Sequence, residues 1–270
     1  MSSQAEALDS SELVELAVEA ARAAGRVLLE RRKGPLAVET KSSATDVVSD
    51  ADRAAEDVAT TTIAAARPHD AVLAEESGTR PGESGLRWVI DPLDGTVNYL
   101  YGRDDWAVSV AVEDAEHTLA SAVYVPVRDE MYHATRGGGA YRNGTRLTVN
   151  DPVEIGQALL ATGFSYDAAH RGEQGNLVAA VLPRVRDIRR AGACAVDLAD
   201  LAAGRADAFY EDEVNHWDVA GAGLVAAEAG ATVGLDVGRG GPPSVAVLVA
   251  GPSLYPAIAA ALGFTGSLLT

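Results

Sequence analysis

Three short segments set carboxylates directly beside apolar, strand-like runs. They are AEES at 74–77, WVIDPLDGTVN at 88–98 and HWDVAGAG at 216–223. In the middle segment the run 88–90 has the character of a buried strand, Asp91 falls where this strand would leave the core, and Pro92 disfavours further pairing. Functional sites of layered α/β proteins form at such strand ends.

These segments supply oxygen ligands rather than sulfur. Asp and Glu, without a recognisable pair of ligating histidines, suit a hard cation such as Mg²⁺ better than zinc or copper. Asp91 and Asp94 stand three residues apart on a turn and can aim at one point. A bridging carboxylate would hold two cations about 3.5 to 4 Å apart, as in-line phosphoryl displacement requires. Gly95 and Thr96 follow at the start of a predicted short helix, where free backbone N–H groups could seat a phosphate.

Each segment also has an ordinary structural explanation. Asp-Gly is a common turn dipeptide, and Asp at a helix start is a routine cap, which would account for Asp91, Asp94 and Asp218. Glu75 and Glu76 could mark a solvated strand end. The combination of all three segments is harder to explain in this way, so it favours metal-dependent phosphate chemistry.

The charge balance restricts the partners of the 270-residue chain. Lys and Arg number 22 and Asp and Glu number 39, a net charge of −17, which disfavours binding to nucleic acids or anionic membranes. The same field would repel a phosphate ester, so a phosphate site needs strong local positive charge. Hydrophobic residues at 47% and charged residues at 23% fit an ordinary globular protein.

Cysteine usage and the apolar runs indicate the compartment. Cys194 is the single cysteine, which excludes an intrachain disulfide and a Cys-based zinc cage and fits a reducing environment. The first ten residues lack an apolar core, and charges interrupt the other apolar runs before membrane-spanning length. We therefore expect a cytoplasmic protein with no membrane partner.

Hydrophobic periodicity predicts layered α/β packing. The run 71–141 is rich in strand-like segments, which predicts a largely antiparallel sheet. Helices and strands alternate after residue 150, which predicts a mixed sheet in a second half. We expect an α+β half at 1–150 with most of the metal ligands and an α/β half at 151–270, packed as one globule. Predicted helices cover 10–33, 49–66, 173–182, 194–204, 217–230 and 255–262, and predicted strands cover 35–40, 71–75, 87–91, 106–112, 119–125, 130–135, 186–189, 206–210 and 244–251.

Taken together, these residues resemble the inositol monophosphatase family. WVIDPLDGTVN and HWDVAGAGLVAAEAGA are similar to its two signatures, and KSSATDVVSDAD, LAEESG, MYHATRGGGAYRNG and GRADAFYE extend the resemblance over most of the chain. It implies an αβαβα sandwich, two to three Mg²⁺ ions per subunit, inhibition by lithium and a homodimer. It also implies hydrolysis of inositol 1-phosphate to inositol and phosphate.

The resemblance implies a set of metal ligands. Glu75, Asp91 and the backbone carbonyl of Leu93 would hold the first ion, and Asp91, Asp94 and Asp218 would hold the second. Asp91 would bridge the two, and a third ion would lie near Glu75.

The resemblance also implies catalytic roles. Thr96 would act with Asp52 to orient and deprotonate the attacking water, beside Glu75 at the metals. Ser49 and Asp52 also form an S-x-x-D pattern typical of a capping box, which does not exclude catalysis. Lys41 begins a KSSATD loop that in the family closes over the metals; an ordinary surface lysine is the alternative.

The remaining implied contacts concern the substrate. Gly192, Ala193 and Cys194 fall on a backbone-contact turn, and Glu211 would accept a hydrogen bond from an inositol hydroxyl. Family members often have Ser or Thr in place of Ala193 and a small aliphatic residue in place of Cys194. We interpret the cysteine as an apolar packing residue rather than a nucleophile. The implied substrate contacts are Asp94, Gly95, Thr96, Gly192, Ala193, Cys194, Glu211 and Asp218.

Other functions stay open at this point. Fructose 1,6-bisphosphate, 3′-phosphoadenosine nucleotides and histidinol phosphate are hydrolysed by relatives with the same metal core. A non-catalytic interaction protein that kept the fold is a further alternative, although retention of Thr96 argues against it. The sequence leaves open the physiological substrate, the oligomeric state, the number of ions held at rest and the effect of Ala193 and Cys194 on specificity.

Overall fold

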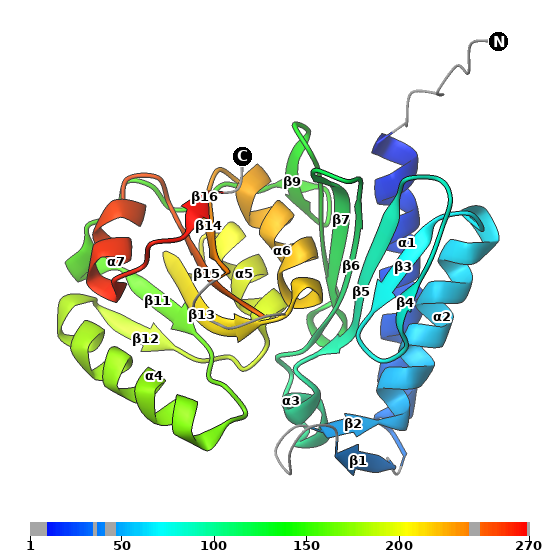
Figure 1. Ribbon diagram of the computed structural model, residues 1–270, viewed down its shortest axis with the longest axis horizontal. Coiled ribbons are helices and arrows are strands. Elements are labelled where there is room, and N and C mark those ends of the chain that lie inside the picture. The colour runs from blue at the N-terminus through cyan, green and yellow to red at the C-terminus, as the bar shows by residue number, and fades with distance from the viewer. Residues whose placement is uncertain (1–9, 35–36, 41–46, 238–243, 269–270) are drawn as a thin grey trace.

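Helices and sheets alternate in five layers (Figure 1). This computed structural model describes residues 10–34, 37–40, 47–237 and 244–268. An eight-stranded and a six-stranded sheet each carry helices on their outer face, and a further helix pair lies between them. The expected αβαβα sandwich is thus confirmed. The loop at 41–46, with Lys41, lies outside the described residues.

Two long helices cover the outer face of the large sheet. The apolar face of α1 (Ser10–Arg31) is buried against it, and α2 (Asp50–Ala66) lies alongside. Both helices confirm the sequence prediction. Ser49 caps α2 in a capping box: its Oγ accepts the N–H of Ala51 at 3.2 Å, and Asp52 Oδ2 accepts the N–H of Ser49 at 2.9 Å.

The large sheet is largely antiparallel, as predicted. Its order is β10-β9-β8-β7-β6-β5-β3-β4, and only the β3–β5 pair is parallel. A separate pair of short strands consists of β1 (Val38–Thr40) and β2 (Val47–Ser49). The large sheet comprises β3 (Ala71–Ala74), β4 (Gly78–Arg80), β5 (Arg87–Asp94), β6 (Ala107–Glu113), β7 (Thr118–Val125), β8 (Glu130–Thr135), β9 (Gly139–Arg142) and β10 (Thr145–Arg146).

Strand β5 corrects the prediction that pairing ends at Asp91. The strand continues through Pro92 to Asp94, but its register with β6 shifts between Asp91 and Asp94. Because proline cannot donate to a ladder, it is tolerated in a strand where pairing is irregular. Gly95 then adopts a left-handed conformation with φ 89°, and the predicted short helix follows as α3 (Thr96–Leu100).

The second sheet is mixed, as predicted. Its order is β12-β11-β13-β15-β14-β16; β11 pairs in parallel with both neighbours and the other pairs are antiparallel. Its strands are β11 (Leu159–Thr162), β12 (Asp187–Arg189), β13 (Ala208–Val214), β14 (Thr232–Asp236), β15 (Val245–Ala250) and β16 (Ser267–Leu268). Its surrounding helices are α4 (Ala168–Val181), α5 (Cys194–Ala202), α6 (His216–Glu228) and α7 (Tyr255–Leu262), and short 3₁₀ turns lie at Pro126–Arg128, Ile155–Gln157 and Leu182–Arg184.

The central core joins the two sheets through α5 and α6. Small residues such as Ala199 and Ala222 are fully buried there, between Val123 of the large sheet and Phe209 of the second.

Helix α4 begins at Ala168 rather than at the predicted Glu173. The division at residue 150 stays a prediction. No helix in the described part of the chain is long and apolar enough to cross a membrane.

Candidate active site

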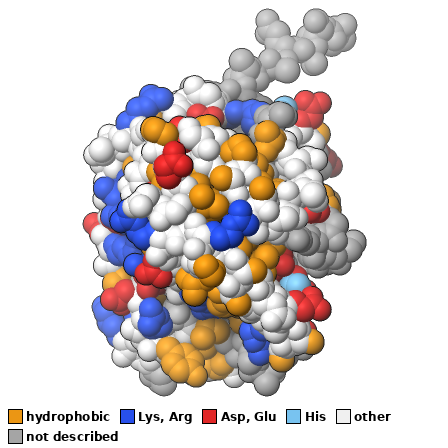
Figure 2. All heavy atoms as spheres, turned by 90° about the vertical axis from the view of Figure 1, so that its left-hand side faces the viewer, with side chains coloured by type: hydrophobic (Ala, Val, Ile, Leu, Met, Phe, Trp, Pro, Cys, Tyr) orange, Lys and Arg blue, Asp and Glu red, His pale blue; other side chains and the backbone are white. Residues whose placement is uncertain are grey.

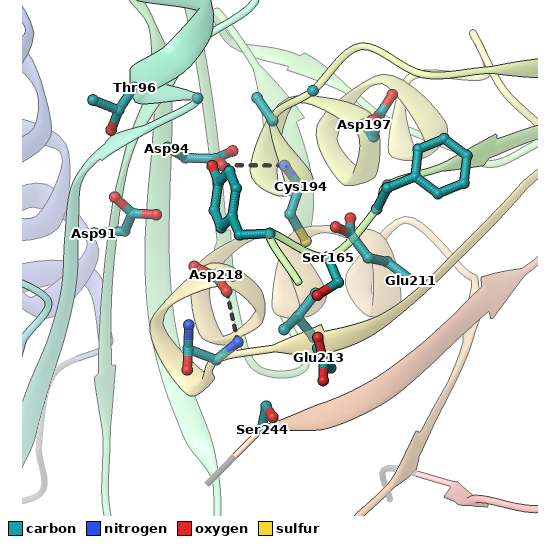
Figure 3. A pocket seen from close by; sticks show the side chains of 18 of the residues that line it. Asp91, Asp94, Thr96, Ser165, Cys194, Asp197, Glu211, Glu213, Asp218 and Ser244 are labelled. Atoms are coloured by element: carbon teal, nitrogen blue, oxygen red, sulfur yellow. Dashed lines mark hydrogen bonds between the residues drawn. The ribbon is translucent and has the colours of Figure 1, made fainter. Parts of the chain in front are cut away.

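A cavity of about 510 Å³ collects nearly every candidate residue. Elements of both sheets line it, with Asp91, Asp94 and Thr96 on one side and Cys194 and Glu211 across from them (Figure 3). Asp52 does not line the cavity but contacts a residue that does. The predicted residues along its wall are Glu75, Asp91, Leu93, Asp94, Gly95, Thr96, Gly192, Ala193, Cys194, Glu211 and Asp218.

Backbone contacts fix the acids of the first sheet. Asp91 is 1% exposed, and its Oδ1 accepts the N–H of Leu93 at 3.0 Å, which closes the turn at the strand irregularity. Glu56 on α2 accepts the N–H groups of Glu76 and Ser77, each at 2.8 Å, and so orders the turn that carries Glu75. The sequence analysis missed Glu56. Its only signal is the four-residue spacing from Asp52, which places both acids on one helix face.

Asp94 connects the large sheet to helix α5. Its carboxylate accepts the N–H of Cys194 at 3.2 Å and the N–H of Ala195 at 2.6 Å. Helix α5 begins after Ala193, whose side chain cannot accept a hydrogen bond, so Asp94 satisfies N–H groups that the helix leaves unpaired. The acid that was expected to bind metal therefore also aligns α5 with the cavity.

Asp218 occupies the third helical position of α6. Asn215 is the N-cap, and its N–H donates to Asp218 Oδ2 at 2.6 Å. The capping explanation for Asp218 is thus correct in part. The same carboxylate faces the cavity, as Figure 3 shows, so capping of α6 is compatible with the expected role as a metal ligand.

The cavity wall is strongly acidic. Arg190 is the one basic residue among the described residues that line it. Burial, followed by the charge of Glu75, raises the pKa of Asp91 and that of Asp218 well above the usual range. Burial raises the pKa of Asp94 to about 7, although the two N–H groups from α5 act in the opposite direction. Such a cluster is costly to ionise unless a cation neutralises it.

The donor set fits a hard divalent cation. Carboxylates and the Leu93 carbonyl supply oxygen ligands, which Mg²⁺ prefers. In the part of the chain that the structure describes, no three acidic, cysteine or histidine side chains converge as a ready-made metal group. Burial raises the pKa of the Cys194 thiol, which agrees with a packing role.

The Asp52–Thr96 pair lies at the edge of the acidic cluster. Thr96 Oγ1 donates to Asp52 Oδ1 at 2.9 Å and also lies 3.1 Å from the Leu93 carbonyl oxygen. Asp52 is 1% exposed, and Ser49 Oγ donates to its other oxygen at 2.5 Å. A hydroxyl that donates its hydrogen bond to a carboxylate keeps its lone pairs free to accept a hydrogen bond from water.

Glu211 forms the far side of the cavity with Asp197. A Cβ atom on Gly163 would lie 2.0 Å from Glu211 Oε1, so a larger residue there would displace this carboxylate. Burial, and then the charge of Asp197, raises the pKa of Glu211 to about 8; burial likewise raises the pKa of Asp197 to about 8. Asp197 was not predicted, although it lies in the first turn of α5.

Known proteins resemble this chain over most of its length. The model of the inositol monophosphatase family matches residues 9–265. An inositol-1-monophosphatase SuhB of Mycobacterium tuberculosis is 41% identical over 238 residues, which is 85% of this chain and 82% of that protein. A Nus factor SuhB of Escherichia coli is 39% identical over 224 residues, 82% of this chain and 84% of its own.

Solved structures show the same fold. The extragenic suppressor protein suhB from Bartonella henselae superimposes with a TM-score of 0.87 at 35% identity, over 94% of this chain and 99% of its own. An inositol monophosphatase from Anabaena gives a TM-score of 0.82 at 30% identity, over 94% of this chain and 96% of the Anabaena chain. With matches of this extent in both sequence and structure, the chain belongs to the inositol monophosphatase family.

Proposed function

We propose that this protein is a magnesium-dependent phosphomonoesterase whose substrate is inositol 1-phosphate. The observation that carries this proposal is the meeting of Asp91, Asp94, Asp218 and the Asp52–Thr96 pair around one cavity. The family supports a phosphatase, and the inositol-1-monophosphatase name of a relative supports the substrate.

The metal ligands would be those of the family pattern. Glu75, Asp91 and the Leu93 carbonyl would hold one ion, Asp91, Asp94 and Asp218 a second, and a third would lie near Glu75. Magnesium bound there would neutralise the charge of the phosphoryl group during its transfer. The raised pKa values of Asp91 and Asp218 support this assignment, because burial and the charge of neighbouring acids make both anions costly unless a cation neutralises them. Lithium should inhibit by competing at the second position.

Thr96 and Asp52 would orient the attacking water. The Thr96 hydroxyl donates to Asp52 and can accept a hydrogen bond from water on its other side. Asp52 is held in turn by the capping box of α2, so its carboxylate is pre-oriented toward Thr96. Gly95 and Thr96 at the start of α3 would receive the phosphate.

Glu211 and the turn of Gly192, Ala193 and Cys194 would contact the alcohol part. At a pH above about 8, where Glu211 is ionised, Glu211→Gln keeps the shape of the side chain but weakens its acceptance of hydroxyl hydrogen bonds, a loss of about 1 to 3 kcal/mol. We expect kcat/KM for inositol 1-phosphate to fall about ten- to a hundredfold, and that for p-nitrophenyl phosphate to change far less. Equal losses on both esters would assign Glu211 to the metal site or the fold instead.

A substrate panel tests the proposal. Purified protein with Mg²⁺ should release phosphate fastest from inositol 1-phosphate, compared with fructose 1,6-bisphosphate, histidinol phosphate and 3′-phosphoadenosine 5′-phosphate. Faster release from one of the other esters would replace the substrate and keep the phosphatase. The absence of release from every ester would remove the enzymatic function altogether.

The alternative of an interaction protein rests on a separate observation. Relatives carry the name Nus factor SuhB, and Arg184, Arg186 and Arg189 are exposed on and beside the edge strand β12. Figure 2 looks onto the outer side of the second sheet and shows Lys and Arg side chains over this face. Binding to a macromolecule that persists in an Asp91→Asn variant would favour this function. The predictions of no nucleic-acid partner and of a homodimer remain open.

A further inference from the structure

The side chain of Asn98 joins two segments of the cavity wall. It is 5% exposed, and its Nδ2 donates to the carbonyl oxygen of Asp105 at 2.7 Å and to that of Ala191 at 2.9 Å. Both partners can only accept hydrogen bonds, so the nitrogen of the amide must face them. Both N–H groups of this buried side chain thus donate to backbone carbonyls, one 7 and the other 93 residues further along the chain.

Asn98 and its partner Ala191 lie beside different parts of the cavity wall. Asn98 lies on α3, two residues after Thr96 on the phosphate side. Ala191 directly precedes Gly192 and the rest of the turn on the alcohol side. The hydrogen bond from Asn98 to Ala191 therefore links the phosphate side of the cavity to the alcohol side.

The backbone packing around Asn98 is tight. A Cβ atom on Gly95 would lie 2.9 Å from the carbonyl oxygen of Asp105 and 3.0 Å from the Cβ of Ala193, and one on Gly192 would lie 3.1 Å from Asn98 Nδ2. Both glycines also have positive φ, 89° and 94°. The segments of Gly95 and Gly192 can approach this closely only because both residues are glycine. A change in the Asn98 amide, which links these segments, should therefore shift one against the other.

Asp105 has support that does not depend on Asn98. Arg128 donates to the Asp105 carboxylate through Nη2 and to Asp200 on α5 through Nη1, at 3.0 Å. This bridge lies outside the cavity and holds the Asp105 loop against α5. Asp94 holds the far end of the turn through Cys194 and Ala195. Loss of the Asn98 amide should therefore loosen the turn at Ala191 without detaching it, while the Asp105 loop stays anchored.

We propose that Asn98 is a positioning residue that sets the alcohol-side turn against the phosphate side of the cavity. This inference rests on the proposed phosphatase function. Asn98 touches neither the phosphate nor the attacking water. Its loss should therefore weaken the recognition of an ester whose alcohol part fills the turn side, and spare an ester that makes few contacts there.

The test compares two esters in three variants. Asn98→Asp keeps the size of the side chain but cannot donate to two carbonyls, and Asn98→Ala removes the amide. Asn150→Ala is the matched control, because Asn150 Nδ2 also donates to two acceptors, Gly204 O at 2.9 Å and Asp207 Oδ1 at 2.8 Å, but lies outside the cavity wall.

Steady-state kinetics with Mg²⁺ would give kcat/KM for the best ester of the substrate panel and for p-nitrophenyl phosphate. The ratio of the two values is independent of the fraction of folded enzyme. We expect this ratio to fall about tenfold in both Asn98 variants, with a raised KM for the larger ester, and to be unchanged in Asn150→Ala.

An unchanged ratio in both Asn98 variants of an active enzyme would overturn the inference. If the ratio is unchanged because kcat/KM falls equally on both esters, Asn98 is a purely structural residue. A wild-type protein that hydrolyses neither ester would instead overturn the proposed function, and the inference with it.

Discussion

Asp91 carries the largest share of the proposed chemistry at the scale of single residues. It is 1% exposed, and burial, followed by the charges of Glu75, Asp94 and Asp218, raises its pKa. Asp91→Asn removes one charge at nearly constant size. We expect turnover to fall about a hundredfold or more, because the lost charge would hold cations at the phosphoryl group. Phosphate release measures the loss.

Protein stability separates this loss from misfolding. In metal-free buffer, Asp91→Asn removes a buried repulsive charge, so the free energy of unfolding should stay constant or rise. Asp187→Asn, an exposed acid on β12, is the control and should keep full activity. Retained turnover in Asp91→Asn would contradict the assignment of the bridging ligand.

Thr96 should affect turnover rather than metal binding. Thr96→Ala removes the hydroxyl that donates to Asp52 but no carboxylate, so calorimetric titration with Mg²⁺ should give nearly the wild-type affinity while kcat falls about a hundredfold. Thr62→Ala is a suitable control, since this hydroxyl donates only to the carbonyl of Val58 within α2. A variant that loses affinity for Mg²⁺ would show that Thr96 supports the metal site.

Local spacing in the sequence predicted the residues that lie together along the chain. Asp91, Asp94 and Thr96 share one segment and one wall of the cavity. The contact from Asp94 to the start of α5 and that from Asn98 to Ala191 join positions far apart in the chain. No periodicity encodes such contacts. The resemblance supplied the turn at Gly192, but neither source pointed to Asn98 or Glu56.

At the scale of elements, replacing two helical glycines by alanine should change the free energy of unfolding in opposite directions. A Cβ atom on Gly25 of α1 would lie 2.5 Å from the ring of Tyr124 and 2.9 Å from Pro126, whereas one on Gly175 of α4 would meet no atom within 4 Å. Gly25→Ala should lower the free energy of unfolding by about 1 to 3 kcal/mol. Gly175→Ala should raise it by about 0.4 to 1 kcal/mol. Urea unfolding measures both, and a stabilised Gly25→Ala would contradict the packing of α1 on the sheet.

The sequence predicted most helices well. Helices α1 and α2 are long and have regular apolar spacing, and α5, α6 and α7 were also found near their predicted bounds. Strands β2, β4, β9, β10, β11, β14 and β16 were not predicted. They are short, and the alternation of two to five residues is too brief to separate from a turn. Pro92 misled the prediction of β5 because the bulge that accommodates it depends on the partner strand β6.

At the scale of the whole molecule, charged side chains fasten the large sheet to α5 and its following turn. Arg205 donates to Glu130 on β8 and to Asp200 on α5. The hydrogen bond from Arg205 is the main cause that lowers the pKa of Glu130 to about 2. A lowered pKa means that this stabilisation is present above the ordinary pKa near 4.5 and is lost as the pH falls toward 2.

Arg205→Met should therefore destabilise the protein most at neutral pH. The difference in free energy of unfolding between wild type and variant should shrink as the pH falls below about 4.5, because Glu130 then becomes protonated in the unfolded chain first. Urea unfolding at a series of pH values measures this difference. A difference that stays constant down to about pH 3 would contradict the pairing of Glu130 with Arg205.

The dependence of phosphate release on magnesium tests the proposed function most directly. An acidic cavity and a dianionic phosphate ester repel each other unless cations lie between them. Purified protein treated with excess EDTA should therefore release no phosphate from inositol 1-phosphate, and activity should return when Mg²⁺ is added beyond the chelator; Ca²⁺, with its looser coordination, should not restore it. Full phosphate release in excess EDTA would contradict the metal-dependent mechanism.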